Sequence, residues 1–340
     1  MRIAAGIGVA VALLYALYSL AASDFSGRAD VDAYIDQLSQ QQGFNREELT
    51  KLFKEAERKQ NILDAIARPA EKTKPWSEYR DVFLTDSRIA EGVEFWRENA
   101  ATLAKAEQEY SVPPEIVVAI IGVETRYGRN AGTYRVLDAL TTLAFDYPPR
   151  ADFFRGELTE FLLLAREEGM DPRSLMGSYA GAMGYGQFIP SSFRNYAVDF
   201  DGDGKRNIWS NPKDAIGSVA NYFRKHGWTA DGHVVEPASI TTPQADAISN
   251  ESLNLQYTVG QLRALGVTVN GLPDAAEAGL YRMDGSAGLE YWVGLHNFYV
   301  ITRYNHSSMY ALAVHQLGQA IAGRASEVAV AEPPPETVSQ

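Results

Sequence analysis

From about residue 30 onward, apolar side chains recur at the three- and four-residue spacing that places them on one face of a helix. Val31, Ile35 and Leu38 predict the buried face of a first helix, and Asn45 predicts the N-cap of a second one. The helical spacing continues to about Glu109. We therefore expect the N-terminal part of the chain to be helical.

Aromatic residues are frequent after a break in this pattern at residues 72–77, which contains Pro75. They are Trp76, Tyr79, Phe83, Phe95 and Trp96. Aromatic side chains at helical spacing are more often core residues than a platform for a ligand. We therefore interpret this group as core.

The pattern changes twice in the second half of the chain. Residues 112 to about 226 are again helical in spacing, with two Gly-rich interruptions. Residues 236–285 lose the long helical periods and gain short β-type segments, such as 253–257 and 267–269, separated by Gly and Pro. Helical spacing returns from about Tyr291 to Ile321. These patterns predict a mainly α (α+β) protein with a small inserted β subdomain.

The first 22 residues carry Arg2 and then an uncharged apolar stretch, which predicts an export signal. Ser19 and Ala21 are small residues where a signal peptidase would cleave after Ala21. The stretch 3–22 is also long enough to span a bilayer if it is retained, since a span needs roughly 20 residues. Either route places residues 23–340 outside the cytoplasmic membrane.

Composition excludes several classes of function. The formal net charge of the 340 residues is −12, which argues against binding to nucleic acid, because that requires a basic face. The chain has no Cys. Disulfides, thiolate metal sites, Cys nucleophiles and a lipid anchor on an N-terminal Cys are therefore excluded.

Glu124 ends an unbroken apolar run, residues 116–123, that follows Pro113 and Pro114. Proline is tolerated in a first helical turn, so the run predicts a buried helix. Burial penalises an ionised carboxyl group, and a glutamate there tends to keep its proton near neutral pH, as a general acid must. Alternatively, Glu124 simply ends the helix and pairs with Arg126 in solvent.

A glycine-rich segment, residues 178–193, is the second candidate site. It has no phosphate-loop lysine, which makes it a poor nucleotide site. Its glycines allow close approach of a ligand, while Tyr185 offers a stacking face and Gln187 an amide that both donates and accepts hydrogen bonds. This equipment suits a neutral sugar. The alternative is a tight helix connection whose glycines serve close packing.

Residues 199–207 match the first nine positions of a calcium loop. Asp199, Asp201 and Asp203 offer carboxylates at positions 1, 3 and 5, and Lys205 would contribute its carbonyl oxygen at position 7. A serine replaces the usual glutamate at position 12, and Asp214 is the best substitute ligand. Such a loop suits one structural ion more than a signalling switch. The alternative is a solvated acidic turn.

Together these motifs resemble the bacterial lytic murein transglycosylase B family over roughly residues 30–322. The matching segments are Val112-Pro113-Pro114-Glu115 with Gly122-Val123-Glu124-Thr125-Arg126-Tyr127-Gly128, Ala180-Gly181-Ala182-Met183-Gly184-Tyr185-Gly186-Gln187-Phe188, the calcium loop, and Tyr304-Asn305-His306-Ser307. The resemblance implies a lysozyme-like catalytic core with an N-terminal α-domain and a small antiparallel β-domain. It also implies cleavage of the β-1,4 bond between N-acetylmuramic acid and N-acetylglucosamine in peptidoglycan, without water, leaving a 1,6-anhydromuramic end.

The resemblance assigns roles to individual residues. Glu124 would be the only catalytic carboxylate, first acid and then base, with the N-acetyl group of the substrate replacing the second acid of an ordinary glycosidase. Ser178 and Gln187 match sugar-binding positions; Tyr222, Tyr304 and Asn305 match cleft positions; Tyr79 and Tyr310 align more loosely. Arg150 falls where the family binds the peptide stem, but Pro149 stands where a second arginine is usual.

The expected organisation follows from pattern and resemblance together. The segments are a signal peptide or anchor (1–22), an N-terminal α-domain (23–108), the catalytic core with the calcium loop (109–228), the β subdomain (229–290), helices returning to the core (291–325) and a disordered tail (326–340). We expect a periplasmic monomer, either free or tethered by residues 3–22 and not a lipoprotein, with one structural Ca²⁺ and no organic cofactor. Its partners would be glycan strands and unidentified cell-wall synthases.

Two other classes of function compete with this assignment. A lysozyme-type hydrolase would share the fold and Glu124 but would add water, so its product would keep a reducing end. A non-catalytic, calcium-stabilised peptidoglycan-binding or scaffold protein would keep the cleft aromatics and would not need Glu124.

Overall fold

The structure is a computed structural model that describes residues 25–67 and 74–331. The chain forms two compact units, residues 1–57 and residues 58–340. The expected signal or anchor at 1–22 and residues 332–340 of the expected tail lie outside the described residues. Within the described ranges, no helix is both long and apolar enough to cross a membrane.

Residues 25–57, the described part of the first unit, contain two helices, α1 (Ala29–Gln42) and α2 (Arg46–Lys54). Val31, Ile35 and Leu38 are buried on α1, which confirms the predicted helix face. The side chain of Asn45 accepts hydrogen bonds from the backbone N–H groups of Glu47 and Glu48 at 2.9 and 3.1 Å. This is the predicted N-cap, which satisfies N–H groups that have no partner in the first helical turn.

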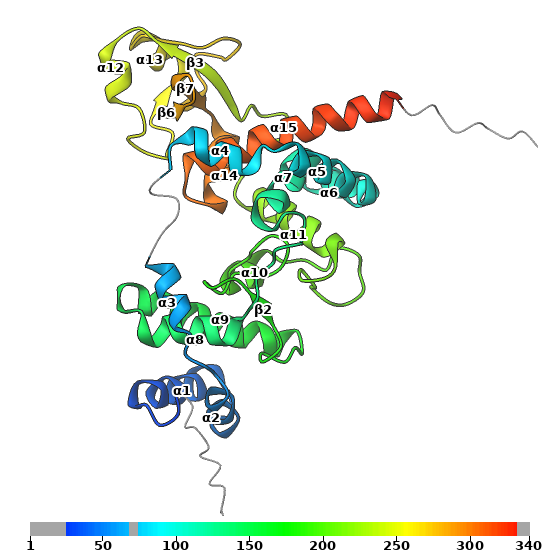
Figure 1. Cartoon of the computed structure of the whole chain (residues 1–340), viewed down its shortest axis with the longest axis vertical. Helices are drawn as coiled ribbons and strands as arrows, with labels where there is room; N and C mark the ends of the chain where they lie inside the picture. Colours follow the sequence, from blue (N-terminus) through cyan, green and yellow to red (C-terminus); the bar gives the residue numbers. More distant parts are fainter. Residues whose placement is uncertain (1–24, 68–73, 332–340) are drawn as a thin grey trace, which may run out of the picture. The chain divides into compact units, whose positions relative to one another are not determined.

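The second unit is mainly helical (Figure 1). Its larger helices are α3 (Gln60–Ile66), α4 (Trp76–Phe83), α5 (Asp86–Glu98), α6 (Ala100–Tyr110), α7 (Pro114–Thr125), α8 (Val136–Asp146), α9 (Ala151–Glu167), α10 (Pro190–Tyr196), α11 (Pro212–Lys225), α14 (His296–Tyr304) and α15 (Ser308–Ala331). Trp76, Tyr79 and Phe95 are buried, as predicted for core aromatics. A short 3₁₀ turn, Pro148–Arg150, joins α8 to α9.

Helix α7 is the centre of this unit, and α5, α6, α11 and α15 pack around it. Ile116, Val118 and Ile120 are at most 3% exposed, as expected of a helix that is apolar on all sides. Gly122 is required here: a Cβ at this position would lie 2.7 Å from the Tyr127 ring. The predicted buried helix is confirmed, and its packing fixes the place where Glu124 emerges.

The β subdomain is an antiparallel sheet of five strands in the order β4-β6-β7-β3-β5 (Figure 1). The strands are β3 (Val235–Ile240), β4 (Tyr257–Thr258), β5 (Val267–Thr268), β6 (Glu277–Gly285) and β7 (Gly288–Gly294), with two short helices, α12 (Pro243–Ala247) and α13 (Val259–Ala264). The subdomain has its own core, which includes Val259, Leu262, Leu280 and Val293. The predicted small inserted sheet is confirmed.

Three predicted boundaries are wrong. Of residues 253–257 only Tyr257 belongs to a strand. The return to helix at Tyr291 is also wrong, because Tyr291 pairs with Arg282 of β6 and Ala238 of β3, and the helix begins at His296. Helix α15 continues to Ala331, beyond Ile321 and into the expected tail, since this segment is rich in Ala, the strongest helix former.

The two ends of the inserted sheet meet at one point. Asn297 is fully buried, and its side chain accepts a hydrogen bond from the backbone N–H of Thr229 at 3.0 Å. It also donates to the carbonyl oxygens of Thr229 and Gly232, both at 2.9 Å. The entry and the exit of the subdomain are therefore held together by one amide side chain.

Candidate active site

Glu124 lies half-buried in the last turn of α7. The hydroxyl group of Tyr310, from α15, donates a hydrogen bond to Oε1 of Glu124 at 2.6 Å. The guanidinium of Arg126 binds the carboxylate of Glu91 at 2.6 and 2.7 Å, so the pairing of Glu124 with Arg126 does not occur. The carboxyl group of Glu124 thus accepts from a buried tyrosine and does not pair with Arg126.

The chain turns sharply after Glu124. Arg126 and Tyr127 have φ angles of 51° and 60°, a conformation that costs non-glycine residues free energy, of order 1–3 kcal/mol each. Thr125 compensates by donating from its hydroxyl to the carbonyl oxygen of Tyr185 at 2.8 Å and accepting from the N–H of Gly128 at 2.9 Å. Strain retained next to an acid indicates a functional turn.

The glycine-rich segment folds into a tight loop. The Ser178 hydroxyl oxygen accepts from the N–H groups of Ala180 and Ala182 at 3.3 and 3.1 Å. The side-chain nitrogen of Gln187 donates to the carbonyl oxygens of Ala131 and Gly184 at 3.2 and 3.0 Å. Its Oε1 has no partner among the described residues, so this oxygen is the part of the amide open to a ligand.

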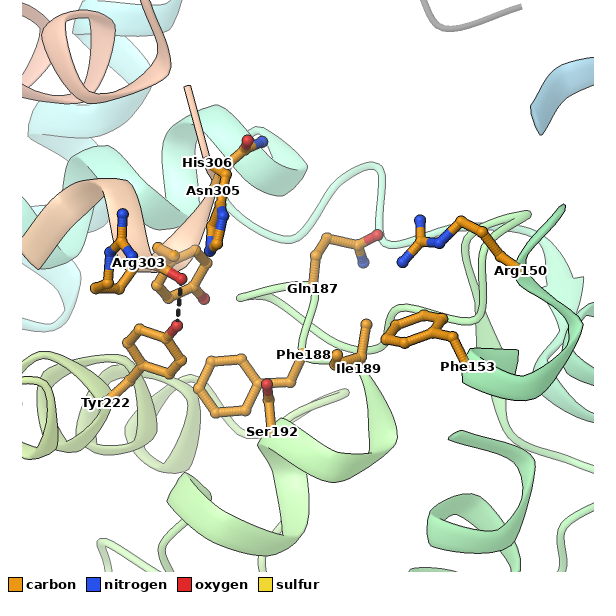
Figure 2. A pocket seen from close by; sticks show the side chains of 11 residues that line it. Arg150, Phe153, Gln187, Phe188, Ile189, Ser192, Tyr222, Arg303, Asn305 and His306 are labelled. Atoms are coloured by element: carbon orange, nitrogen blue, oxygen red, sulfur yellow. Dashed lines mark hydrogen bonds between the residues drawn. The ribbon is translucent and has the colours of Figure 1, made fainter. Parts of the chain in front are cut away.

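A cavity of about 560 Å³ brings together five of the predicted site residues. They are Arg150, Gln187, Tyr222, Tyr304 and Asn305 (Figure 2). Ser178, Tyr185, Tyr79, Tyr310 and Glu124 are not among its lining residues. The Tyr185 ring packs against the protein instead, 6.4 Å from the Phe95 ring and so close to Gly128 that a Cβ there would lie 2.2 Å from it.

The cavity also has lining residues that were not among the predicted site residues, chiefly Phe153, Phe188, Arg303 and His306. Phe188 and His306 do stand in the segments that match the family. Arg303 and His306 flank the predicted pair Tyr304 and Asn305 in the chain, and Phe153 follows Arg150 by one helical turn. Their closeness in sequence to predicted site residues is the feature that could have identified them as lining residues.

Three tyrosines lie close to Glu124 or line the cavity. The Tyr222 hydroxyl donates to the carbonyl oxygen of Arg303 at 2.6 Å (Figure 2). The Tyr304 hydroxyl donates to the carbonyl oxygen of Gly186 at 2.5 Å. Burial raises the pKa of Tyr222, Tyr304 and Tyr310 above the usual value of tyrosine. These hydroxyl groups therefore stay protonated and act as donors.

Four carboxyl groups meet in the predicted calcium loop. Ligand oxygens of Asp199, Asp201, Asp203 and Asp214 all lie within 4.8 Å of one another. Asp214 is fully buried and accepts from the N–H groups of Phe200 and Asn207, both at 2.8 Å. Burial, together with the nearby Asp201 and Asp199, raises the pKa of Asp214. Oxygen donors that repel one another fit a hard divalent cation.

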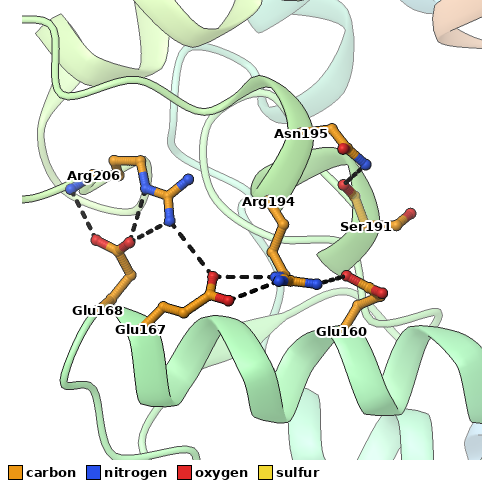
Figure 3. A network of polar contacts seen from close by, with 7 residues as sticks. All are labelled: Glu160, Glu167, Glu168, Ser191, Arg194, Asn195 and Arg206. Atoms are coloured by element: carbon orange, nitrogen blue, oxygen red, sulfur yellow. Dashed lines mark hydrogen bonds and ion pairs between the residues drawn. The ribbon is translucent and has the colours of Figure 1, made fainter. Parts of the chain in front are cut away.

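A network of ion pairs anchors this loop to two helices (Figure 3). Arg206, from the loop, binds Glu168 at 2.8 Å just after α9. Glu167 lies 3.9 Å from Arg206 and 2.7 Å from Arg194 of α10. The loop, α9 and α10 are therefore linked through neighbouring carboxylates.

A helical core that presents one half-buried carboxyl group near a cavity of tyrosines, amides and arginines defines a carbohydrate-cleaving enzyme of the lysozyme-like class. Residues 26–319 match the sequence profile described as Transglycosylase SLT domain. The chain belongs to this family and is a peptidoglycan lytic transglycosylase. The family expected from the sequence and the lysozyme-like fold are confirmed.

Similar proteins agree with this assignment. The chain is 48% identical over 309 residues, 88% of its own length and 84% of the relative, to membrane-bound lytic murein transglycosylase B of Escherichia coli strain K12. Among solved structures, the catenated lytic transglycosylase SltB1 from Pseudomonas aeruginosa is 56% identical with a TM-score of 0.86, covering 89% of this chain and 100% of that one.

Two further solved structures contain ligands. The Escherichia coli lytic transglycosylase Slt35 in complex with calcium is 46% identical with a TM-score of 0.83, covering 90% of this chain and 96% of that one. SltB3 from Pseudomonas aeruginosa in complex with NAG-anhNAM-pentapeptide is 31% identical with a TM-score of 0.77, covering 86% of this chain and 78% of that one.

Proposed function

We propose that the enzyme cleaves the β-1,4 bond between N-acetylmuramic acid and N-acetylglucosamine without water, with Glu124 as its single acid and base. The observation that carries this proposal is that, among the residues that the structure describes, no Asp or Glu lines the cavity, while Glu124 lies near it with Tyr310 as a donor. An ordinary glycosidase needs two carboxyl groups across the scissile bond.

Two other carboxylates near this region are already engaged. Glu91 binds Arg126, and the buried Glu157 accepts from the N–H and hydroxyl groups of Ser191 at 3.0 and 2.8 Å. Each of these carboxylates is thus held by neighbouring groups of the protein. This supports a mechanism in which the substrate supplies what a second protein acid would otherwise provide.

In the proposed reaction, Glu124 first donates its proton to the glycosidic oxygen, and the C1–O bond breaks. The N-acetyl group of the muramic residue stabilises the positive charge that develops at C1. Glu124, now ionised, then accepts the proton of the C6 hydroxyl group. The C6 oxygen bonds to C1 in the same step. The products are a free 4-hydroxyl group and a 1,6-anhydromuramic end, and no water is consumed. The anhydro sugar bound to SltB3 supports this product.

The side chains around the cavity have matching roles in this proposal. Ser178 and Gln187 would hydrogen-bond the glycan, with Tyr222, Tyr304 and Asn305 lining the cleft. Arg150 would face the peptide stem, and the pentapeptide bound to SltB3 supports a stem-bearing substrate. Tyr79, Tyr185 and Tyr310 would act from behind, holding the Glu124 turn and the loop.

We propose Ca²⁺ as the structural ion of the acidic loop. The four converging carboxylates and the calcium bound to Slt35 support it. Asp199, Asp201, Asp203 and Asp214 would hold the ion together with the carbonyl oxygen of Lys205. The ion would neutralise the loop and fix it against α11.

We propose that the enzyme acts in the periplasm, where peptidoglycan lies. The leader composition of residues 1–22 supports export, and the Escherichia coli relative described above is a membrane-bound enzyme. Turnover and remodelling of the cell wall would be its role.

Glu124→Gln tests the assignment of the acid. Residues 23–340 should release muropeptides from purified sacculi that are lighter by one water than hydrolysis products, and the variant should lose activity by a factor on the order of 10² to 10⁴. Mass spectrometry of the released products and their rate of release measure both expectations.

Glu115→Gln is the matched control. Glu115 lies at the other end of α7, nine residues before Glu124 and on the opposite side of the helix. It should leave the rate near that of the wild type. Products that carry an added water, or full activity of Glu124→Gln, would refute the proposal.

A further inference from the structure

The acidic loop, residues 199–207, leads directly into a tight turn whose position depends on one of its carboxylates. The N–H of Asn207 donates to the carboxylate of Asp214 at 2.8 Å. The side-chain oxygen of Asn207 accepts from the N–H groups of Trp209 and Ser210 at 3.2 and 3.1 Å. Asp214, a proposed ligand of Ca²⁺, therefore also holds the turn that follows the loop.

This turn is bonded to the glycine-rich segment, residues 178–193, and to the strand that precedes it. The carbonyl oxygen of Ile208 accepts from the N–H of Tyr185 at 3.0 Å. The indole Nε1 of Trp209 donates to the carbonyl oxygen of Met176 at 3.1 Å. Two consecutive residues of the turn therefore hold the glycine-rich segment at its start and in its middle.

The contact at Ile208 leaves no room for a side chain on the opposite backbone. Ile208 is 2% exposed, and a Cβ on Gly184 would lie 2.4 Å from the Ile208 carbonyl oxygen. Gly184 has a φ angle of 68°, a conformation that favours glycine. Because packing this close transmits displacements, a shift of the turn would move the backbone that leads to Gln187.

Tyr185 also joins this turn to the proposed acid. Its carbonyl oxygen accepts from the hydroxyl of Thr125 at 2.8 Å, and Thr125 directly follows Glu124. The N–H and the C=O of one residue therefore connect the acidic loop with the strained turn after Glu124.

We propose that Trp209 is a positioning residue through which Ca²⁺ in the acidic loop and glycan in the cavity strengthen each other's binding. The inference rests on the proposed function. Four carboxylates whose oxygens lie within 4.8 Å repel one another when no cation is bound. This repulsion weakens the hold of Asp214 on Asn207, and the turn then supports Tyr185 and Gln187 less firmly. Neutralising the loop restores that support.

Calorimetry tests the coupling in the Glu124→Gln background, in which the ligand is not cleaved. The probe is NAG-NAM-pentapeptide, a ligand bound to SltB3 from Pseudomonas aeruginosa in a solved structure. It is titrated in EGTA and in Ca²⁺. Its affinity should be about fivefold or more higher with Ca²⁺, and the probe should raise the affinity for Ca²⁺ by the same factor, because coupling between two sites is reciprocal.

Trp209→Phe removes the indole N–H but keeps an aromatic ring beside Phe193, whose ring centre lies 5.5 Å from that of Trp209. This variant should still gain melting temperature with Ca²⁺. Its coupling factor should be lower by about twofold or more, as expected for the loss of one hydrogen bond. Trp292→Phe, in β7, is the matched control, because Nε1 of Trp292 has no partner among the described residues. Its coupling factor should equal that of the parent protein.

Amide hydrogen exchange reports on the bond between Tyr185 and Ile208, which no side-chain substitution removes. Ca²⁺ should slow the exchange of the Tyr185 amide by a larger factor than that of the amides in β6 and β7 of the β subdomain, because the ion acts on the local opening of the glycine-rich segment. Equal slowing in both places would reflect global stability alone and would contradict the proposal.

Two further results overturn the proposal. They are equal affinity for NAG-NAM-pentapeptide with and without Ca²⁺, and a coupling factor that Trp209→Phe leaves unchanged. A melting temperature that does not respond to Ca²⁺ would contradict both the proposed ion and this inference. Failure to bind NAG-NAM-pentapeptide under either condition would instead contradict the proposed glycan site, and the exchange at Tyr185 would then decide whether the two loops are coupled.

Discussion

At the scale of single residues, the contact that defines the site joins positions far apart in the chain. Glu124 could be singled out from the sequence because an acid at the end of an apolar helix is unusual. Its partner could not, since Tyr310 comes from α15 and aligned only loosely with the family. Local sequence identifies an unusual residue, while its donor is determined by how α7 and α15 pack.

Tyr310→Phe should lower kcat about tenfold or more with a smaller change in KM. The Tyr310 hydroxyl, held protonated by burial, donates at 2.6 Å to the carboxyl group of Glu124, and hydrogen bonds to charged groups contribute about 1.5–3 kcal/mol. Initial rates on sacculi across pH 4–8 measure the loss and any shift of the profile.

Tyr257→Phe is the matched control, because it removes another tyrosine hydroxyl that donates to a glutamate, Glu251, at 3.1 Å in the β subdomain. Its kcat should remain that of the wild type. A Tyr310→Phe enzyme with an unchanged rate and pH profile would show that Glu124 needs no donor from α15.

At the scale of elements, prediction succeeded where the determining contacts are local. The α2 cap depends on residues two and three positions from Asn45, and the acidic loop is contained within sixteen positions of the chain. It failed at β7, where Tyr291 is a strand residue because of its neighbours on β6 and β3. The lining of the cavity was predicted only in part, because it too depends on contacts between distant segments. Arg303 lines the cavity because α14 packs beside Tyr222 of α11.

Calcium should raise the melting temperature of the metal-free protein, by on the order of 5 °C at a hundredfold excess over Kd. Asp201→Ala with Asp203→Ala should remove this increase. Asp214 is unsuitable for the test, because its carboxylate also holds the N–H groups of Phe200 and Asn207. Thermal scans with EGTA and with Ca²⁺ measure the difference.

The control for the calcium test is Asp81→Ala with Asp284→Ala, which removes the same charge from exposed positions outside the loop. This variant should keep the full response to calcium. If the wild type melts at one temperature with and without the ion, the loop does not bind it.

At the scale of the whole molecule, stability depends on keeping His315 uncharged. Burial in the middle of α15 lowers the pKa of His315 from 6.5 to about 4, and its Nδ1 has no partner among the described residues. The folded state therefore binds its proton more weakly than the unfolded state. The stabilisation is complete above pH 6.5 and is lost as the pH falls toward 4.

Acidification from pH 7.5 to 5.0 should therefore cost about 2 kcal/mol through this one residue. His315→Leu should remove that part of the pH dependence. Unfolding in urea at the two pH values measures the free energies. Burial raises the pKa of Glu115, which lines a second cavity together with His315, so this residue contributes with the opposite sign.

His306→Gln is the control, because His306 is exposed. This variant should lose as much stability on acidification as the wild type does. Comparing each variant with the wild type at both pH values cancels the contribution of Glu115. Equal losses in the wild type and in His315→Leu would mean that other groups cause the acid sensitivity.

The clamp formed by Asn297 suggests how this architecture can diversify. Because Thr229 and Gly232 bind the same buried amide, the sheet leaves and rejoins the helical body at a single junction. We therefore expect that a shorter linker or a different module could replace the β subdomain at this junction while α11 and α14 keep their places. Such a replacement would leave the residues around Glu124 unchanged.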